Sequence, residues 1–255
     1  MNPSPIAVQI VALALSCGLA VAQSTHTYST NFPATENPIS EGGLWVNGGT
    51  DALDWTDMRT TSGFAFGTQS GTNPAQFDDS IAVLTGAWDS DQTAQATIKI
   101  GTPITAGAPC YQESEILLRA NLSAHSAKLY EVNVGQRNDS RSYINIVRWN
   151  GPLGSYTTLL NVQGTAYGVN TGDVVKASIV GSTITAYING VQKAQVVDTS
   201  YASGNPGMGM YLQDPSLCGS GISNFGFSNY AAASSSSAPP PTPQPCIKKH
   251  GHCPK

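Results

Sequence analysis

Alternation of apolar and polar residues with a period of two is the feature that most constrains the fold of this chain. It recurs in three segments, residues 93–100, 175–179 and 183–188. Such alternation is typical of strands with one buried and one solvent-facing side. Gly181-Ser182 and Asn189-Gly190 are hairpin-turn signals between the later segments. The pattern predicts a three-stranded meander over residues 173–197. Because no segment after the apolar N-terminal run has a helical periodicity, we expect an all-β antiparallel domain.

The chain divides into a predicted signal peptide, one domain and a tail. Residues 1–22 are mostly apolar and end in Ala20-Val21-Ala22, a small-x-small sequence typical of signal-peptidase cleavage sites. Residues 23–230 have uniform composition and are expected to form a single domain. Residues 231–245 predict a disordered Ser/Pro-rich linker, and residues 246–255 form a short Cys/His tail.

Cysteine usage is typical of an oxidising compartment. Cys17 lies inside the predicted signal peptide, where a lipid anchor is the alternative to cleavage. The four other cysteines are an even number in an exported chain, which favours disulfides. Their grouping along the sequence favours Cys110–Cys218 and Cys246–Cys253, although four cysteines allow three pairings. In the tail, a metal site with the neighbouring histidines is the alternative.

The low content of charged residues argues against nucleic acids and anionic membranes as partners. Charged residues make up 11% of the 255 residues, and the formal net charge is −4, whereas soluble domains carry roughly 25%. Nucleic-acid binding needs a basic face, and anionic membranes attract polybasic segments. The N-terminal apolar run is short for a membrane span. We therefore expect no nucleic-acid partner and no membrane span.

The C-terminal half resembles a known superfamily. Residues 172–192, GDVVKASIVGSTITAYINGVQ, are followed by Asp198-Thr199-Ser200 and by the glycine-rich segment Gly204-Asn205-Pro206-Gly207-Met208-Gly209. These segments are similar to the concanavalin A-like lectin/glucanase superfamily, in its laminin-G-like bacterial secreted branch. The resemblance covers roughly residues 80–227. It implies a single-domain jelly-roll β-sandwich of the concanavalin A-like type, with a sugar groove on the concave sheet.

Glu113, Glu115 and Arg119 are the candidate catalytic residues. In a strand they would share one face with Leu117. Two carboxyl groups at positions i and i+2 suit paired acid/base chemistry. Glucanases of the superfamily carry a third acidic position in this run, which is missing here. The alternative is a solvated strand face with an intrastrand ion pair.

Tyr143, Asn145 and Trp149 are candidate ligand-binding residues, together with Glu115 and Arg119. The first three share one face of a predicted strand. Aromatic rings cover the apolar face of a sugar, and amides pair with its hydroxyls. The alternative is that these side chains are ordinary core residues of the sandwich.

Asp89 and Asp91 are candidate calcium ligands, with Asp78-Asp79 upstream. No glycine-spaced calcium loop follows them, and aspartate is also a common turn residue. We therefore expect no cofactor, with a structural Ca²⁺ as the alternative.

The leading functional hypothesis is a secreted carbohydrate-binding or surface-interaction module without catalysis. It is expected to be extracellular or periplasmic, to be a monomer, and to bind a polysaccharide or other glycan. The alternative is a polysaccharide-degrading enzyme, either a lyase or a glycoside hydrolase, that uses carboxylates on the concave sheet.

Overall fold

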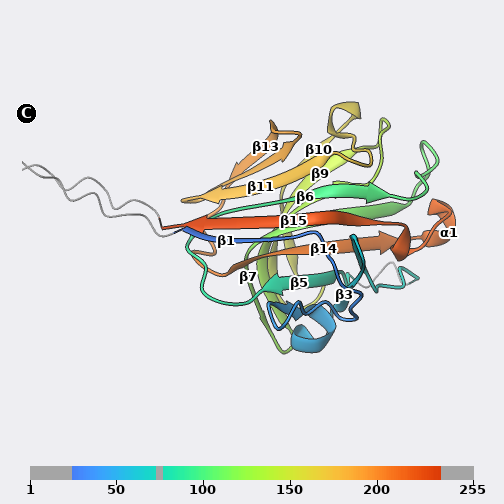
Figure 1. The fold of residues 1–255 in the computed structure, drawn as a ribbon. Helices are drawn as coiled ribbons and strands as arrows, with labels where there is room; N and C mark the ends of the chain where they lie inside the picture. The colour runs from blue at the N-terminus through green and yellow to red at the C-terminus, as the bar shows by residue number, and fades with distance from the viewer. Residues whose placement is uncertain (1–24, 73–76, 237–255) are drawn as a thin grey trace, which may run out of the picture.

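Strands dominate the part of the chain that the structure describes. A computed structural model describes residues 25–72 and 77–236, and Figure 1 shows their fold. The strands are β1 (Thr25–Thr30), β2 (Trp45–Asn47), β3 (Thr56–Thr61), β4 (Phe64–Gly67), β5 (Ser80–Leu84), β6 (Asp91–Ile100), β7 (Tyr111–Ser123), β8 (Ser126–Gly135), β9 (Tyr143–Gly151), β10 (Tyr156–Gln163), β11 (Val174–Val180), β12 (Thr183–Ile188), β13 (Val191–Val197), β14 (Asn205–Gln213) and β15 (Phe225–Ser235). The all-β prediction is confirmed.

Helical structure in the described ranges is limited to single turns. They are α1 (Pro215–Cys218), η1 (Gly48–Ala52), η2 (Thr165–Tyr167) and η3 (Ile222–Asn224). None of the helices within residues 25–72 and 77–236 has the length and apolar character needed to cross a membrane. The predicted signal peptide, most of the predicted linker and the Cys246–Cys253 pair lie outside the described residues.

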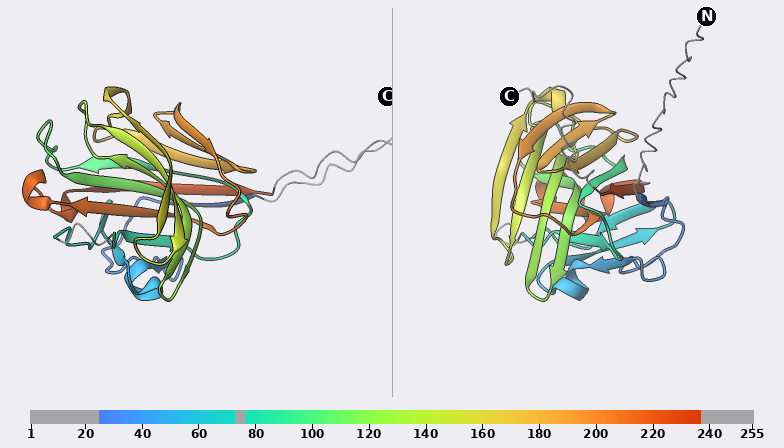
Figure 2. Two further views of the ribbon diagram at one scale, coloured as in Figure 1. Left: turned by 180° about the vertical axis from the view of Figure 1, so that it is seen from behind. Right: turned by 90° about the vertical axis from the view of Figure 1, so that its left-hand side faces the viewer.

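The strands form two layers joined by β3. We call the first layer the cleft sheet; its strand order is β10-β9-β8-β7-β14-β5, with β2 beside β5. The second, the back sheet, has the order β4-β15-β6-β11-β12-β13, with β1 beside β15. Figure 2 shows β7 to β10 lying side by side as one curved layer. β3 pairs antiparallel with β4 and parallel with β5, so one short parallel pairing departs from the expected antiparallel arrangement.

The main core lies between these sheets. Ile116 and Leu118 of β7 and Met208 of β14 belong to the same buried cluster as Phe225 and Phe227 of β15. Since successive side chains of a strand alternate between its faces, Glu113, Glu115 and Leu117 are directed to the other face of β7. The outer face of the cleft sheet has its own smaller apolar cluster, which includes Leu117 and Trp149.

The predicted meander is confirmed. β11, β12 and β13 pair antiparallel in chain order. Asn189 and Gly190 have φ angles of 50° and 76° in the second turn, as expected of the Asn-Gly pair in a tight hairpin. This meander extends the back sheet beyond β6.

The last strand runs past the predicted end of the domain. β15 continues to Ser235, five residues beyond the expected boundary at Tyr230. Residues 231–235 pair with β1 on one side and with β6 on the other, and Figure 1 shows β1 beside β15. Sheet pairing therefore orders the Ala/Ser-rich segment that composition alone assigned to the linker.

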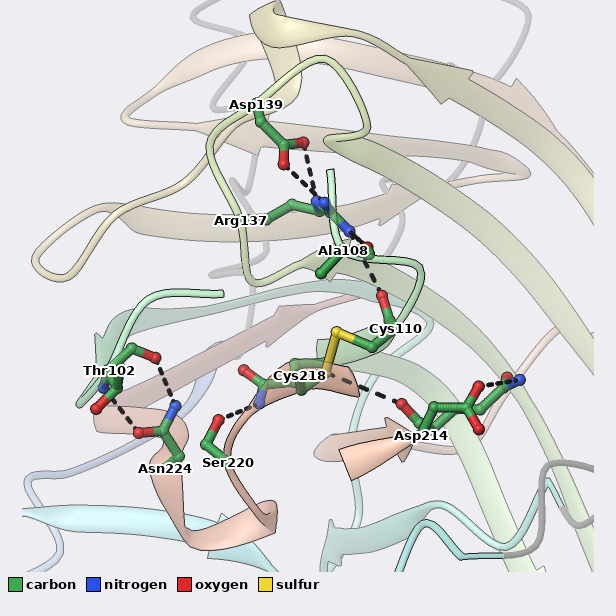
Figure 3. Close-up of a disulfide and its surroundings, with 11 residues drawn as sticks. Thr102, Ala108, Cys110, Arg137, Asp139, Asp214, Cys218, Ser220 and Asn224 are labelled. Atoms are coloured by element: carbon green, nitrogen blue, oxygen red, sulfur yellow. Dashed lines mark hydrogen bonds and ion pairs between the residues drawn. A yellow bond between two sulfur atoms is a disulfide. The ribbon is translucent and has the colours of Figure 1, made fainter. Parts of the chain in front are cut away.

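The predicted disulfide between Cys110 and Cys218 is present, with their Cα atoms 5.4 Å apart. It joins the residue before β7 to α1, which follows β14 (Figure 3). Arg137 donates from Nη1 to the carbonyl oxygens of Ala108 and Cys110, at 3.1 and 3.4 Å. The same guanidinium bonds both carboxylate oxygens of Asp139, at 2.9 and 2.6 Å. The disulfide and this arginine therefore hold one end of the cleft sheet together.

Removing the disulfide should destabilise the domain. Its cysteines are 108 residues apart, and a cross-link of that span stabilises by about 4–5 kcal/mol in the chain-entropy description. We expect the Cys110→Ala/Cys218→Ala variant to lose about 2–5 kcal/mol of unfolding free energy in urea titrations. The reduced parent should match the variant. Equal unfolding midpoints for the variant and the oxidised parent would contradict a stabilising role for this bond.

Candidate functional site

A cavity of about 400 Å³ opens on the outer face of the cleft sheet. We call it the cleft. Its walls come from β7, β8, β9, β10 and β14 and from the segment before β5. Three kinds of side chain line it: aromatic rings, amides and carboxyl groups. The lining amides are Asn133, Asn145, Asn161 and Gln213.

Four carboxyl groups are buried at this site. Glu113 and Glu115 come from β7, Glu131 comes from β8, and Asp79 immediately precedes β5. Their exposed fractions are 8%, 0%, 4% and 5% respectively. Asp79, Glu113 and Glu131 line the cleft, whereas Glu115 is fully buried and is not part of its wall.

Strand register brings these groups together. Glu131 pairs with Leu117, and Asn133 pairs with Glu115, across β7 and β8. On the other side of β7, Glu115 pairs with Gly209 of β14. A Cβ atom at Gly209 would collide with the Glu115 carboxylate, so a glycine at this position makes room for the buried carboxyl group.

Hydrogen bonding differs among the carboxyl groups. Glu131 accepts from the indole nitrogen Nε1 of Trp149 at 2.7 Å and from Nδ2 of Asn133 at 2.6 Å. Glu113 accepts from the Tyr143 hydroxyl. Neither carboxylate oxygen of Glu115 has a hydrogen-bond partner in the described protein. Glu131 thus accepts two side-chain hydrogen bonds, whereas Glu115 accepts none in the described protein.

Within the described residues, no ion pair offsets the burial of these carboxyl groups. The four ion pairs within residues 25–72 and 77–236 involve other carboxylates. The pKa of Glu113 is raised to about 8: desolvation raises it most, the hydrogen bond from Tyr143 lowers it, and the nearby Glu131 adds to the rise. Burial, and then repulsion from Glu131, raises the pKa of Glu115. Burial also raises the pKa of Asp79 and of Glu131. Burying ionised groups without a partner is costly, and such strongly shifted groups concentrate at functional sites.

Aromatic rings form the walls of the cleft. Tyr156 and Tyr111 are 40% and 36% exposed. Phe77 meets the Tyr156 ring edge-on, with centroids 5.2 Å apart. The ring centroids of Trp149 and Tyr156 are 5.6 Å apart. These packed rings give an apolar surface beside the amides and carboxyl groups.

The structure brings most of the predicted site residues together. Glu113, Asn145 and Trp149 line the cleft. Tyr143 contacts Glu113 and lines an adjoining smaller pocket. Glu115 lies on the same face of β7 but is fully buried.

Arg119 does not join them. The pairing of β7 with β8 shifts register between Leu118 and Asn121, and Arg119 itself has a φ angle of 48°. Its buried guanidinium donates to the carbonyl oxygens of Ser90, Tyr201 and Gly181 at 2.7–2.8 Å. The expected alternation therefore ends before Arg119, which holds loops together instead of facing the cleft or pairing with Glu115.

Asp89 and Asp91 also lie apart from the carboxyl cluster. Asp91 accepts from the Gly181 amide at 2.9 Å and lies 3.9 Å from Arg119. The backbone amide of Asp89 donates to the Ser234 hydroxyl at 3.0 Å. Within the described ranges, the group of carboxylates with a geometry suited to a metal ion is Asp79, Glu115 and Glu131.

Sequence reasoning did not assign Glu131, Asn133 or Tyr156 to the site. One signal was present for the first two: in residues 130–135 Glu131 and Asn133 alternate with Tyr130, Val132 and Val134. That alternation predicts a shared face. It does not reveal that this face adjoins Glu113 and Glu115, since that depends on strand pairing.

Replacing Glu113 with glutamine should change how stability depends on pH. The pKa of Glu113 rises from 4.5 to about 8 on folding, so its contribution is complete below pH 4.5 and is lost as the pH rises toward 8. We expect Glu113→Gln to unfold much like the parent at pH 5 and to be the more stable protein at pH 8. Urea unfolding at pH 5 and at pH 8 measures the stability of the variant and of the parent. The buffer contains EDTA, because a bound cation would alter the local charge.

Asp139 provides a control of opposite sign. Its hydrogen bonds with Arg137 lower the pKa of its carboxyl group. The stability this gives is present above the unfolded pKa and is lost as the pH falls. Asp139→Asn should therefore lose about 1–3 kcal/mol at pH 7 and approach the parent in acid. A Glu113→Gln variant that is less stable than the parent at pH 8 would contradict the shift assigned to Glu113.

Comparison with known proteins adds information about the fold. No protein-family model matches the sequence, and no curated protein matches it significantly. Solved structures do match. The structure is similar to the CBM2 module of the evolved Dit of Lactobacillus casei BL23 phage J-1, with a TM-score of 0.50 and 12% identity, over 86% of this chain and 99% of that one.

Two structures named as enzymes have a similar fold. Beta-agarase A from Zobellia galactanivorans matches with a TM-score of 0.50 and 9% identity, over 85% of this chain and 94% of that one. A 1,3-alpha-1,4-beta-D-galactose-4-sulfate-3,6-anhydro-D-galactose 4 galactohydrolase matches with a TM-score of 0.50 and 9% identity, over 88% of this chain and 100% of that one. Together with the two-layer topology, these similarities show that the chain has the concanavalin A-like jelly-roll fold.

Proposed function

We propose that this protein binds a glycan chain in the cleft of its outer sheet face. The observation that carries the proposal is the combination of exposed aromatic rings and amides in one cavity of about 400 Å³. Tyr156 and Tyr111 offer flat apolar surfaces, which suit the C–H face of a sugar ring. Asn145, Asn161 and Gln213 can pair with its hydroxyls. The cavity is large enough for a sugar-sized ligand.

Further observations support a glycan as the ligand and a location of the protein outside the cytoplasm. Structures similar in fold include a CBM2 module, a beta-agarase and a galactohydrolase whose name specifies a galactose-based substrate. The Cys110–Cys218 disulfide suits an oxidising compartment. With the signal-like N-terminal segment, these features support a secreted, extracellular or periplasmic protein.

Tyr156 provides the test of binding. We expect Tyr156→Ala to weaken glycan affinity by about 3- to 10-fold, because one aromatic contact contributes about 0.5–1.5 kcal/mol. A glycan array identifies a ligand for the parent, and calorimetry then compares the variants. Tyr187→Ala is the matched control, since Tyr187 lies on β12 in the back sheet and packs with Lys176. Equal losses in both variants, or no ligand for the parent, would argue against binding in the cleft.

Cleavage of the bound glycan is a second candidate function. Glu113 and Glu131 both line the cleft, from neighbouring strands. Most glycoside hydrolases use two carboxyl groups that flank the scissile bond. In this chain Tyr143 orients Glu113, and Trp149 and Asn133 orient Glu131. The pair thus has the fixed geometry that acid/base chemistry requires.

Product analysis separates binding from cleavage. If the protein is a hydrolase, the parent should release new reducing ends from the glycan that it binds. Glu113→Gln should then reduce the rate by at least about 100-fold while binding persists. A lyase would release unsaturated products instead. A parent that binds the glycan without releasing either product supports the binding function alone.

A further inference from the structure

We propose that Asp79, Glu115 and Glu131 bind a divalent cation, Ca²⁺, at the floor of the cleft. The site rests on side chains from three parts of the cleft sheet: the residue before β5, the middle of β7 and the middle of β8. One oxygen of each carboxylate lies within 4.8 Å of the others. Two ligands on opposite sides of Ca²⁺ are about 4.6–5.2 Å apart, because each Ca–O distance is about 2.3–2.6 Å. The three oxygens can therefore share one ion.

An unpartnered amide oxygen provides an independent indication. Asn133 is 3% exposed, lines the cleft and donates from its Nδ2 atom to Glu131 at 2.6 Å. Its carbonyl oxygen Oδ1 has no hydrogen-bond partner in the described protein. Asn133 also pairs with Glu115 across β7 and β8, so its amide group adjoins two of the carboxylates while its oxygen keeps its lone pairs uncommitted. Amide carbonyl oxygens are normal ligands of Ca²⁺.

The carboxylates also have uncommitted oxygens. Both oxygens of Glu115 and Oδ1 of Asp79 lack partners in the described protein. Three buried carboxylates that form no ion pair within the described residues repel one another, whereas a divalent cation would offset that repulsion and satisfy these oxygens. The ligand set consists of oxygen atoms alone, which favours hard cations over zinc or copper.

The position of the cation would allow it to contact the bound glycan. Asp79 and Glu131 line the cleft, while Glu115 lies behind them. A cation held by all three would direct its remaining coordination positions toward the cavity, where sugar hydroxyls could complete the shell of six to eight oxygens. This step rests on the proposed glycan-binding function, whereas the cation site itself does not depend on it.

Calcium titration tests the site without any glycan. The full-length protein is treated with EDTA, dialysed and titrated with CaCl₂ in a calorimeter. We expect saturable binding of one ion. Thermal unfolding at 100 times the dissociation constant should shift upward by about 5–10 °C. Absence of saturable binding would overturn the proposal.

Two sets of variants locate the ion. Glu115→Gln and Asp79→Asn keep the side-chain shape and should each weaken Ca²⁺ binding by at least about 10-fold, since affinity follows the charge of the ligand set. Far-ultraviolet circular dichroism checks that both variants fold. The Asp89→Asn/Asp91→Asn variant carries the same kind of change outside the cluster and should bind Ca²⁺ like the parent. The reverse pattern would place the ion at Asp89 and Asp91 and overturn this site.

Glycan binding with and without Ca²⁺ then tests the link. For the glycan found on the array, we expect affinity to fall by about 5-fold or more in EDTA. Unchanged affinity in EDTA would overturn the direct role of the cation in ligand binding. If Ca²⁺ binds at Glu115 but no glycan binds in either buffer, the cation site stands and the proposed glycan-binding function fails.

Discussion

The alternation of side chains along β7 is the constraint on which the rest of the structure depends. Ile116 and Leu118 enter the core between the sheets, while Glu113 and Glu115 point to the outer face. A shift of one residue would place carboxyl groups in the apolar core and leucine in the cleft. The buried apolar side of β7 therefore specifies the register that assembles the site.

The neighbouring strands adapt to this arrangement. β14 has glycine opposite Glu115, where any side chain would meet its carboxylate. β8 supplies Glu131 and Asn133 at the positions that pair with Leu117 and Glu115. β9 supplies Trp149, whose indole nitrogen donates to Glu131. The carboxyl groups are thus held by a rigid sheet, which is where a site that needs fixed geometry is best built.

The ends of the cleft sheet are held by different interactions. At one end the Cys110–Cys218 disulfide and Arg137 fix the entry to β7. At the other end Arg119 bonds three carbonyl oxygens from separate loops. Gly204, with a φ angle of 137°, packs against the Arg119 backbone so closely that a Cβ atom would collide with it. Both arginines are therefore committed to the framework, and in the described part of the chain the carboxyl groups between them form no ion pair.

The sequence by itself determined the all-β fold class and the meander at residues 173–197, and it favoured the pairing of Cys110 with Cys218. These features follow from local information: period-two alternation, turn residues and the grouping of cysteines. It also placed Glu113 and Glu115 on one face of a strand, and Tyr143, Asn145 and Trp149 on one face of another. Only the tertiary structure decided which strands adjoin, and so added Asp79 and Glu131 to the cluster. It also decided that a register shift turns Arg119 away and that pairing with β1 orders residues 231–235. The physical reason is that strand pairing, bulges and the balance of buried charge depend on residues far apart in the chain, which local patterns do not encode.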